Sequence, residues 1–124
     1  MIKLEDKTLY ITRGDSTNEH NKLVFNWNDY EYQESDIITL IIFEKKGYPK
    51  NEVLKKEYNA SDLIYDSTNH SIELELTTDD TLKFPLKNKK QTFWFDIYLN
   101  DNTTMLGFDE DGAKKCIVYP GIER

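Results

Sequence analysis

Two glutamates with a spacing suited to acid–base chemistry stand in the segment Ser71–Leu76. On a β-strand, Glu73 and Glu75 would lie on one face with their Cα atoms about 6.5–7 Å apart. Many glycosidases use a pair of carboxyl groups at roughly this separation. Both glutamates alternate with apolar residues, however, so we expect them to face solvent, where burial does not tune a carboxyl group for proton transfer. The pattern favours a solvated strand face, and we predict that the protein is not an enzyme.

Metal-binding and cofactor-binding patterns are missing from the sequence. His20, His70 and Cys116 stand apart and form no metal-ligand spacing. The run Asp109–Asp111 resembles half of a calcium loop but lacks the remaining ligands, which favours a hairpin turn. There is no glycine-rich phosphate loop and no nucleophile–base motif. We therefore expect no catalytic residue, no cofactor and no metal, and we expect Cys116 to be a buried strand residue.

The tripeptide Arg13-Gly14-Asp15 matches the integrin-binding motif. Three residues match by chance often, and the motif needs an exposed tip on an extracellular protein. Thr12-Arg13-Gly14-Asp15 directly follows a predicted strand, so we predict a structural turn instead. Gly14 would supply a positive φ, and Asp15 would bond the turn amides.

The segment Phe93–Leu99 is apolar on both faces. One face carries Phe93, Phe95, Ile97 and Leu99, which we assign to the core. The other carries Trp94, Asp96 and Tyr98, two rings flanking a carboxylate. Such a row could stack on sugars, with Tyr30 and Tyr32 as further platforms, or could anchor a protein interface. Alternatively, the segment Asn21–Tyr32 could cover this face as part of the core.

Alternation of apolar and polar residues is the dominant pattern along the chain. It predicts strands at Thr8–Ile11, Leu23–Trp27, Ile37–Phe43, Val53–Tyr58, Ser71–Leu76, Phe93–Leu99, Thr104–Phe108 and Lys115–Tyr119. The last three would form a meander, and a short helical turn is predicted at Thr78–Thr81. Since Ile37–Phe43 is apolar on both faces, we expect it to be a central strand. We predict one all-β domain over residues 1–124, an Ig-like antiparallel β-sandwich of about seven or eight strands, with a barrel as the alternative.

Charge and hydropathy narrow the classes of partner. The formal net charge of −7 argues against binding to nucleic acid, which needs clustered lysine and arginine. The N-terminus lacks the apolar region of a signal peptide, and no apolar run is long enough to span a bilayer. We expect a chain made in the bacterial cytoplasm without a signal peptide, with no membrane and no nucleic-acid partner.

The order of several short motifs resembles the N-terminal domain of upper baseplate proteins from phages that infect Gram-positive bacteria. These motifs are Thr12-Arg13-Gly14-Asp15 after a strand, Ser35-Asp36-Ile37-Ile38 at the entry to a long apolar strand, Leu76–Thr81, and the aromatic strand Phe93–Leu99. The resemblance runs from about Leu9 to Tyr119. Ser35 stands where the family usually has glycine, and the chain stops at Arg124, where those proteins usually continue into a distal receptor-binding or fibre region.

This resemblance implies a structural role in a phage or prophage tail or baseplate. The partners would be other tail or baseplate proteins, with self-association as a further option, and the protein would be assembled into the virion tail. The alternative function is a carbohydrate-binding β-sandwich module that uses the aromatic residues named above.

Overall fold

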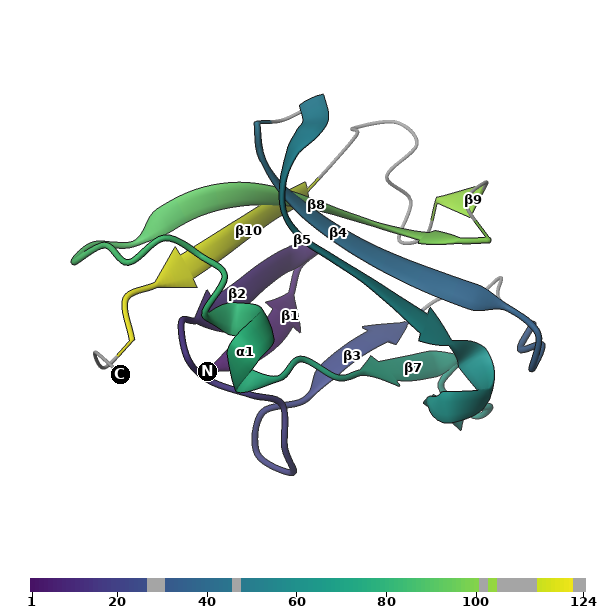
Figure 1. The fold of residues 1–124 in the computed structure, drawn as a ribbon. Helices are drawn as coiled ribbons and strands as arrows, with labels where there is room; N and C mark the ends of the chain where they lie inside the picture. Colours follow the sequence, from purple (N-terminus) through teal and green to yellow (C-terminus); the bar gives the residue numbers. More distant parts are fainter. Residues whose placement is uncertain (27–30, 46–47, 101–102, 105–113, 122–124) are drawn as a thin grey trace.

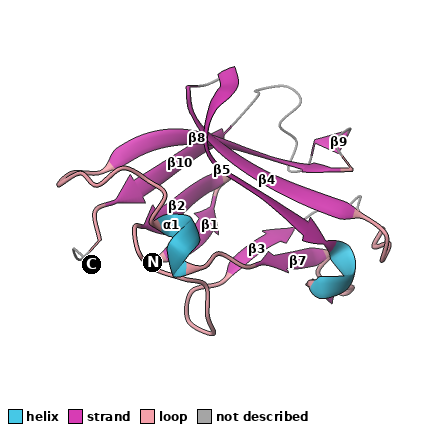
Figure 2. Ribbon diagram, viewed as in Figure 1, coloured by secondary structure: helices cyan, strands magenta, loops and turns pink. Residues whose placement is uncertain are grey.

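β-strands make up most of the described chain (Figures 1 and 2). The structure is a computed structural model that describes residues 1–26, 31–45, 48–100, 103–104 and 114–121. Its strands are β1 (Ile2–Glu5), β2 (Thr8–Thr12), β3 (Leu23–Asn26), β4 (Ile37–Lys45), β5 (Tyr48–Asn59), β6 (Ile64–Asp66), β7 (Ser71–Leu74), β8 (Gln91–Leu99), β9 (Thr103–Thr104) and β10 (Lys114–Tyr119). The helical elements are η1 (Ala60–Asp62) and α1 (Thr78–Thr81). No helix within these ranges is long and apolar enough to cross a membrane.

The strands form two sheets that face each other (Figure 1). The seven-stranded sheet has the order β1-β2-β10-β8-β4-β5, with β9 also paired to β8. The three-stranded sheet has the order β3-β7-β6. Within the larger sheet β2 and β10 are parallel, and the other pairs are antiparallel.

This strand order is that of an immunoglobulin-like sandwich, which confirms the predicted fold class. In such folds one sheet contains the B, E and D strands and the other contains the C, F and G strands. Here β3, β7 and β6 take the first set of places, and β4, β8 and β10 take the second. The additional strands extend the larger sheet at its two sides, β1 and β2 beyond β10 and β5 beyond β4.

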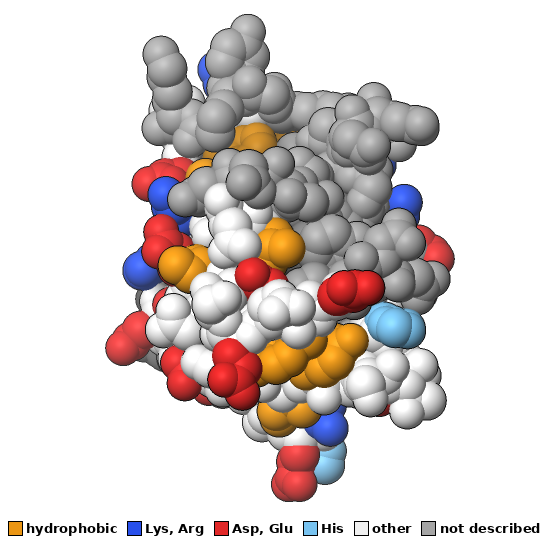
Figure 3. Space-filling view, turned by 90° about the vertical axis from the view of Figure 1, so that its right-hand side faces the viewer, with side chains coloured by type: hydrophobic (Ala, Val, Ile, Leu, Met, Phe, Trp, Pro, Cys, Tyr) orange, Lys and Arg blue, Asp and Glu red, His pale blue; other side chains and the backbone are white. Residues whose placement is uncertain are grey.

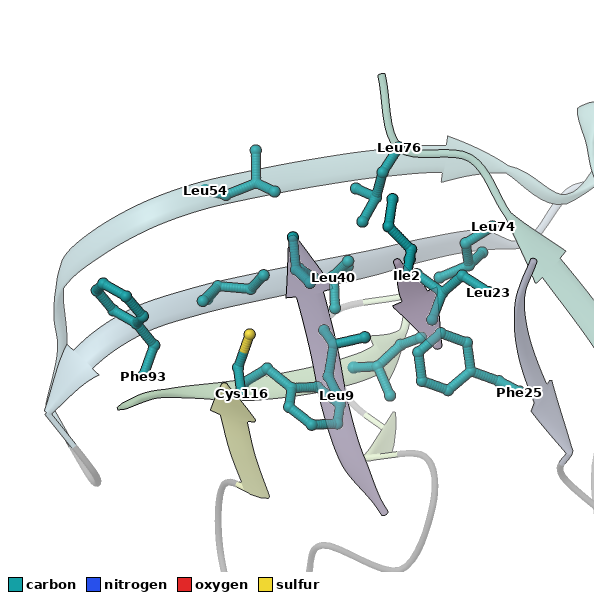
Figure 4. Close-up of a cluster of buried hydrophobic side chains, with 14 of the residues drawn as sticks. Ile2, Leu9, Leu23, Phe25, Leu40, Leu54, Leu74, Leu76, Phe93 and Cys116 are labelled. Carbon is teal, nitrogen blue, oxygen red and sulfur yellow. The ribbon is translucent and has the colours of Figure 1, made fainter. Parts of the chain in front are cut away.

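The core lies between the sheets, where alternate residues of each strand meet (Figure 4). Figure 4 shows Leu9, Leu40 and Cys116 of the larger sheet in one cluster with Leu23 and Phe25 of the smaller one. The full buried cluster contains four phenylalanines, Phe25, Phe84, Phe93 and Phe95. Burial of a phenyl ring removes a large apolar area from water, so these rings stabilise the packing of one sheet on the other.

The strand Ile37–Phe43 is central, as predicted. β4 lies between β8 and β5, and its residues from Ile38 to Phe43 are buried on both faces. Thr39, on the outer face of the sheet, is fully buried. A strand covered on both faces explains why the sequence shows no alternation here.

Three features of the larger and smaller sheets differ from the sequence prediction. β10 pairs with β8 rather than with β9, so the predicted C-terminal meander is wrong. β1 and β6 were not predicted; β6 has only three residues, and the alternation in Ile2–Glu5 is short. The predicted strand extending through residues 105–108 and the predicted turn at 109–111 lie outside the described residues.

Candidate functional site

Thr12-Arg13-Gly14-Asp15 forms a tight turn at the end of β2. The amide of Asp15 donates to the carbonyl of Thr12 at 3.0 Å, which closes the turn. Gly14, at the third position, has φ of 92°, the conformation that favours glycine there. The predicted turn is confirmed. The carboxylate of Asp15 pairs with the amino group of Met1.

The guanidinium group of Arg13 is bound within the domain. Its Nε donates to the carbonyl of Phe84 at 2.8 Å, and a terminal nitrogen donates to the carbonyl of Leu82 at 3.4 Å. The backbone amide of Arg13 donates to the carbonyl of Tyr119 at 3.0 Å. Arg13 therefore ties the end of β2 both to the segment after α1 and to the end of β10, which argues against an integrin-binding loop.

The side-chain hydroxyl of Thr81 in α1 also binds the turn. Its Oγ1 accepts from the amide of Gly14 at 2.9 Å and donates to the carbonyl of Asp15 at 2.7 Å. Thr81 is fully buried, so both bonds are shielded from water. Gly121 approaches the turn so closely that a Cβ built on it would lie 1.9 Å from the carbonyl oxygen of Arg13. The turn is a structural junction of β2, α1 and the segment after β10.

α1 is held by a capping box at its start. The hydroxyl of Thr77 accepts from the amide of Asp80 at 3.1 Å, and the carboxylate of Asp80 accepts from the amide of Thr77 at 2.8 Å. Lys56 of β5 also donates to the carboxylate of Asp80. The helical turn predicted at Thr78–Thr81 is confirmed, and the ion pair fixes it to the larger sheet.

Trp94, Asp96 and Tyr98, hereafter the outer row, lie on the face of β8 that points away from the core. The alternate residues Phe93, Phe95 and Ile97 are buried between the sheets, whereas the three residues of the outer row are half-buried. Across the ladder, Trp94 pairs with Phe43 and Lys115, Asp96 with Ile41, and Tyr98 with Thr39. The sequence-based division of β8 into two faces is therefore confirmed.

Asp96 is half-buried and lies opposite Ile41 of β4 in the ladder. Burial raises its pKa, while a hydrogen bond of 2.8 Å from the backbone amide of Ile97 opposes that effect. A carboxylate in such a place favours a partner that supplies N–H donors or a positive charge.

The aromatic character of the outer face continues onto β2 and β10. The rings of Tyr10 and Tyr119 stack with centroids 6.5 Å apart and planes inclined by 21°. Lys3 lies over the ring of Tyr10, with its Nζ 5.3 Å from the centroid. Alternation within β2 and β10 places Tyr10 and Tyr119 on this face, but their proximity depends on the parallel pairing of distant segments, which the sequence pattern does not encode locally.

The sequence predicted that Tyr30 and Tyr32 would join the outer row, but Tyr32 does not. Its ring stacks on Tyr65 of β6 with centroids 4.9 Å apart, and its hydroxyl donates to the carbonyl of Ala60 at 3.1 Å. Tyr32 packs against the core rather than forming a platform for a sugar. Tyr30 lies outside the described residues.

The apolar residues of β3 within the segment Asn21–Tyr32 do not cover the outer row, and residues 27–30 of that segment lie outside the described residues. Within that segment, Leu23 and Phe25 of β3 belong to the smaller sheet and are buried in the core. They therefore contact the inner face of the larger sheet, opposite to the face of the outer row (Figure 4).

Glu73 and Glu75 line a cleft at the open edge of the sandwich, between β5 and β7. The cleft has a volume of about 440 Å³, and its lining includes Lys22, Lys56, Tyr58 and Asp62. Glu73 is half-buried with Lys22 3.9 Å away, and Glu75 is exposed. The alternation predicted their common face, but the cleft beside them arises from the gap between two sheets, which no local pattern describes.

The remaining reactive side chains do not gather into a site in the part of the chain that the structure describes, and the histidine side chains on the face shown in Figure 3 lie apart. No group of three or more histidine, cysteine, aspartate or glutamate residues there could hold a metal ion. Cys116 is fully buried, as predicted, and burial raises the pKa of its thiol.

Comparison of the chain with protein-family models, with curated proteins and with solved structures gave no match. The strand order described above is therefore the evidence for the fold class.

Proposed function

We propose that this protein is a structural assembly module that docks onto a partner protein through the outer face of its larger sheet. Following the motif resemblance, the assembly is a phage or prophage tail or baseplate, and the partner is another tail or baseplate protein. The observation that carries the proposal is the outer row, two half-buried rings flanking the carboxylate of Asp96.

The composition of this face supports a protein interface. Tryptophan and tyrosine are enriched among the residues that dominate binding energy, because a large ring buries much area while fixing few rotatable bonds. Trp94 and Tyr98 lie on the face opposite to the core, and the Tyr10–Tyr119 stack extends the aromatic surface along the sheet. Lys3 on the end strand β1 borders this surface beside Tyr10, and Lys115 of β10 lies next to Trp94, so charged groups accompany the rings as in many protein interfaces.

The internal use of Arg13 supports an assembly role over a receptor-binding role for the Arg-Gly-Asp tripeptide. Its guanidinium group donates hydrogen bonds to two backbone carbonyls of the domain. The tripeptide therefore maintains the sandwich on which the outer row is displayed.

Size-exclusion chromatography with light scattering tests the proposal, using the purified chain mixed with the products of its neighbouring genes. We expect a complex with one of them, if these include tail proteins, and at least tenfold weaker binding for Trp94→Ala. The matched control is Leu86→Ala, which removes an exposed apolar side chain from the segment between α1 and β8 and should leave binding unchanged.

Two outcomes would contradict the proposal. One is a protein that stays monomeric at high concentration and binds none of the tail proteins encoded by its neighbouring genes. The other is glycan binding that Trp94→Ala abolishes in a still-folded protein, which would instead support the carbohydrate-binding alternative.

A further inference from the structure

The free edge of the larger sheet lies beside the cleft between β5 and β7. Among the described strands, β5 is the last one on its side of the larger sheet, so its outer backbone groups face no neighbouring strand. The opposite wall of the cleft is formed by the smaller sheet, including Leu74 and Glu75. The cleft and the strand edge are thus continuous.

The two halves of β5 differ in regularity. From Leu54 to Asn59 the strand pairs with Ile42 to Ile37 without interruption. Beyond Ile42 the register shifts twice, between Ile42 and Phe43 and between Phe43 and Lys45. Irregular pairing twists an edge away from a new strand, whereas a regular edge can accept one. The regular half of β5 is the half that borders the cleft.

The charges in the cleft define what such a strand must carry. Four acidic residues line the cleft, Glu57, Asp62, Glu73 and Glu75, together with two lysines; Glu57 lies opposite Thr39 in the ladder, so its side chain is on the outer side of β5. Lys56 is already paired with Asp80, and Lys22 lies 3.9 Å from Glu73. Among the described residues no cation lies within ion-pair distance of the three other carboxylates. The cleft therefore has an excess of negative charge.

Lys56 also limits the kind of strand that fits. Its partner across the ladder, Leu40, is a core residue, so Lys56 points toward the space between the sheets. A charged side chain facing inward on an edge strand disfavours a purely apolar neighbour. Because Asp80 balances the charge of Lys56, the uncompensated groups that an incoming side chain meets are carboxylates.

We propose that this edge accepts an extended segment of a partner protein with lysine or arginine at alternate positions. The segment adds to β5 along Leu54–Asn59, and every second side chain enters the cleft toward the carboxylates. Backbone hydrogen bonds would supply affinity, and the basic side chains would supply specificity. This second contact surface is separate from the outer row and does not rest on the assembly function proposed for it.

Three synthetic peptides and ¹H–¹⁵N NMR test the proposal on the full chain. The first peptide is acetyl-Thr-Arg-Val-Arg-Val-Arg-Thr-amide. The second replaces arginine by citrulline, which has nearly the same shape but no charge. The third keeps arginine but is N-methylated at alternate residues, so that it cannot form a strand ladder. We expect the first to shift and protect from exchange the amides of Leu54–Asn59, and the other two to bind at least tenfold more weakly.

Charge variants locate the contact. The double variant Asp62→Asn, Glu75→Gln should bind the arginine peptide at least tenfold more weakly. The control Glu44→Gln, Glu52→Gln removes the same amount of charge from positions away from the cleft and should bind the peptide as tightly as the native protein does. The proposal is overturned if the arginine peptide fails to bind at millimolar concentration, if citrulline binds equally well, or if the N-methylated peptide binds equally well. Shifts confined to the outer row, or dimers formed through β5 without peptide, would also overturn it.

Discussion

Thr81 and Thr39 are both fully buried, yet only the hydroxyl of Thr81 makes hydrogen bonds among the described residues. Thr81 joins Gly14 and Asp15 of the turn to α1. The Oγ1 atom of Thr39 is buried on the outer face of the larger sheet without such a partner. The same side chain therefore stabilises the fold in one place and carries an uncompensated desolvation cost in the other.

Valine substitutions at these two positions should have different effects. Thr81→Val keeps the shape but removes the two hydrogen bonds between the hydroxyl and the turn, at about 0.5–1.5 kcal/mol each, so we expect a loss of about 1–3 kcal/mol in unfolding free energy. Thr39→Val removes an unsatisfied hydroxyl and should be neutral or stabilising. Urea unfolding followed by circular dichroism measures both. Equal losses for the two variants would show that the Thr81 bonds do not hold the turn.

The sequence predicted the turn but not its contact with Thr81. A glycine between Arg13 and Asp15 after a strand indicates a turn, because a positive φ is costly for other residues. The partner of the turn, Thr81, stands 67 residues after Gly14. Only the folding of the β7–β8 connection against the end of β2 brings them together, and no local pattern records that contact.

At the scale of elements, α1 is the smallest unit with an identifiable role. It has four residues, too few to be helical alone. The capping box, the Lys56 ion pair and the bonds of Thr81 hold it between β5 and the turn. We therefore expect α1 to respond to pH, because Asp80 takes part in two of these three contacts.

Asp80→Asn should change the acid limb of the stability profile. Burial alone would raise the pKa of Asp80, but the hydrogen bond and charge of Lys56, with the Thr77 contacts, outweigh burial and lower the pKa below the ordinary value of an aspartate. A carboxyl group with a lowered folded-state pKa stabilises the fold above about pH 4 and loses that effect as the pH falls through the folded value. Asp80→Asn should thus be less stable at pH 7 and lose less stability below pH 4.

The control for this experiment is Asp79→Asn, which removes the same charge from an exposed position in the same helix. It should leave the slope of the unfolding free energy against pH nearly unchanged. A parallel change in the two variants would mean that general charge, rather than the Lys56–Asp80 pair, governs the acid limb.

The strands were predictable where one face is buried and the other faces solvent. Ser71–Leu76 shows this alternation most clearly, and β7 lies there. β6 was missed because three residues cannot show a period. The neighbour of β10 was predicted wrongly because pairing with β8 and β2 joins residues far apart in sequence, so turn positions alone do not determine it.

At the scale of the whole molecule, Asp96 links stability to the proposed docking surface. Burial raises its pKa, so folding penalises the charged form. The penalty is absent below the unfolded-state pKa, grows as the pH rises from that value to the folded-state pKa, and is fully present above it. Asp96→Asn keeps an oxygen that can accept from the amide of Ile97 and should be more stable than the native protein at pH 7, with the difference vanishing near pH 3.

The same variant should bind its partner less tightly if Asp96 lies in the docking surface. Greater stability with weaker binding is the expected result for a charged group retained for function. Thermal unfolding at pH 7 and pH 3, together with light scattering of the complex, measures the two effects. Lower stability at pH 7 would show that the carboxylate serves the fold instead.

The junction at Arg13 has a further consequence for how the domain can be joined to other chains. The amides of Thr12 and Arg13 donate to the carbonyls of Met1 and Tyr119, so both ends of the sandwich meet at consecutive residues of one turn. A host polypeptide could therefore enter and leave the domain at a single point, as a loop insertion requires. Circular permutation with a short connecting linker is feasible for the same reason. The outer row and the free edge of β5 belong to other parts of the surface and would remain accessible in either arrangement.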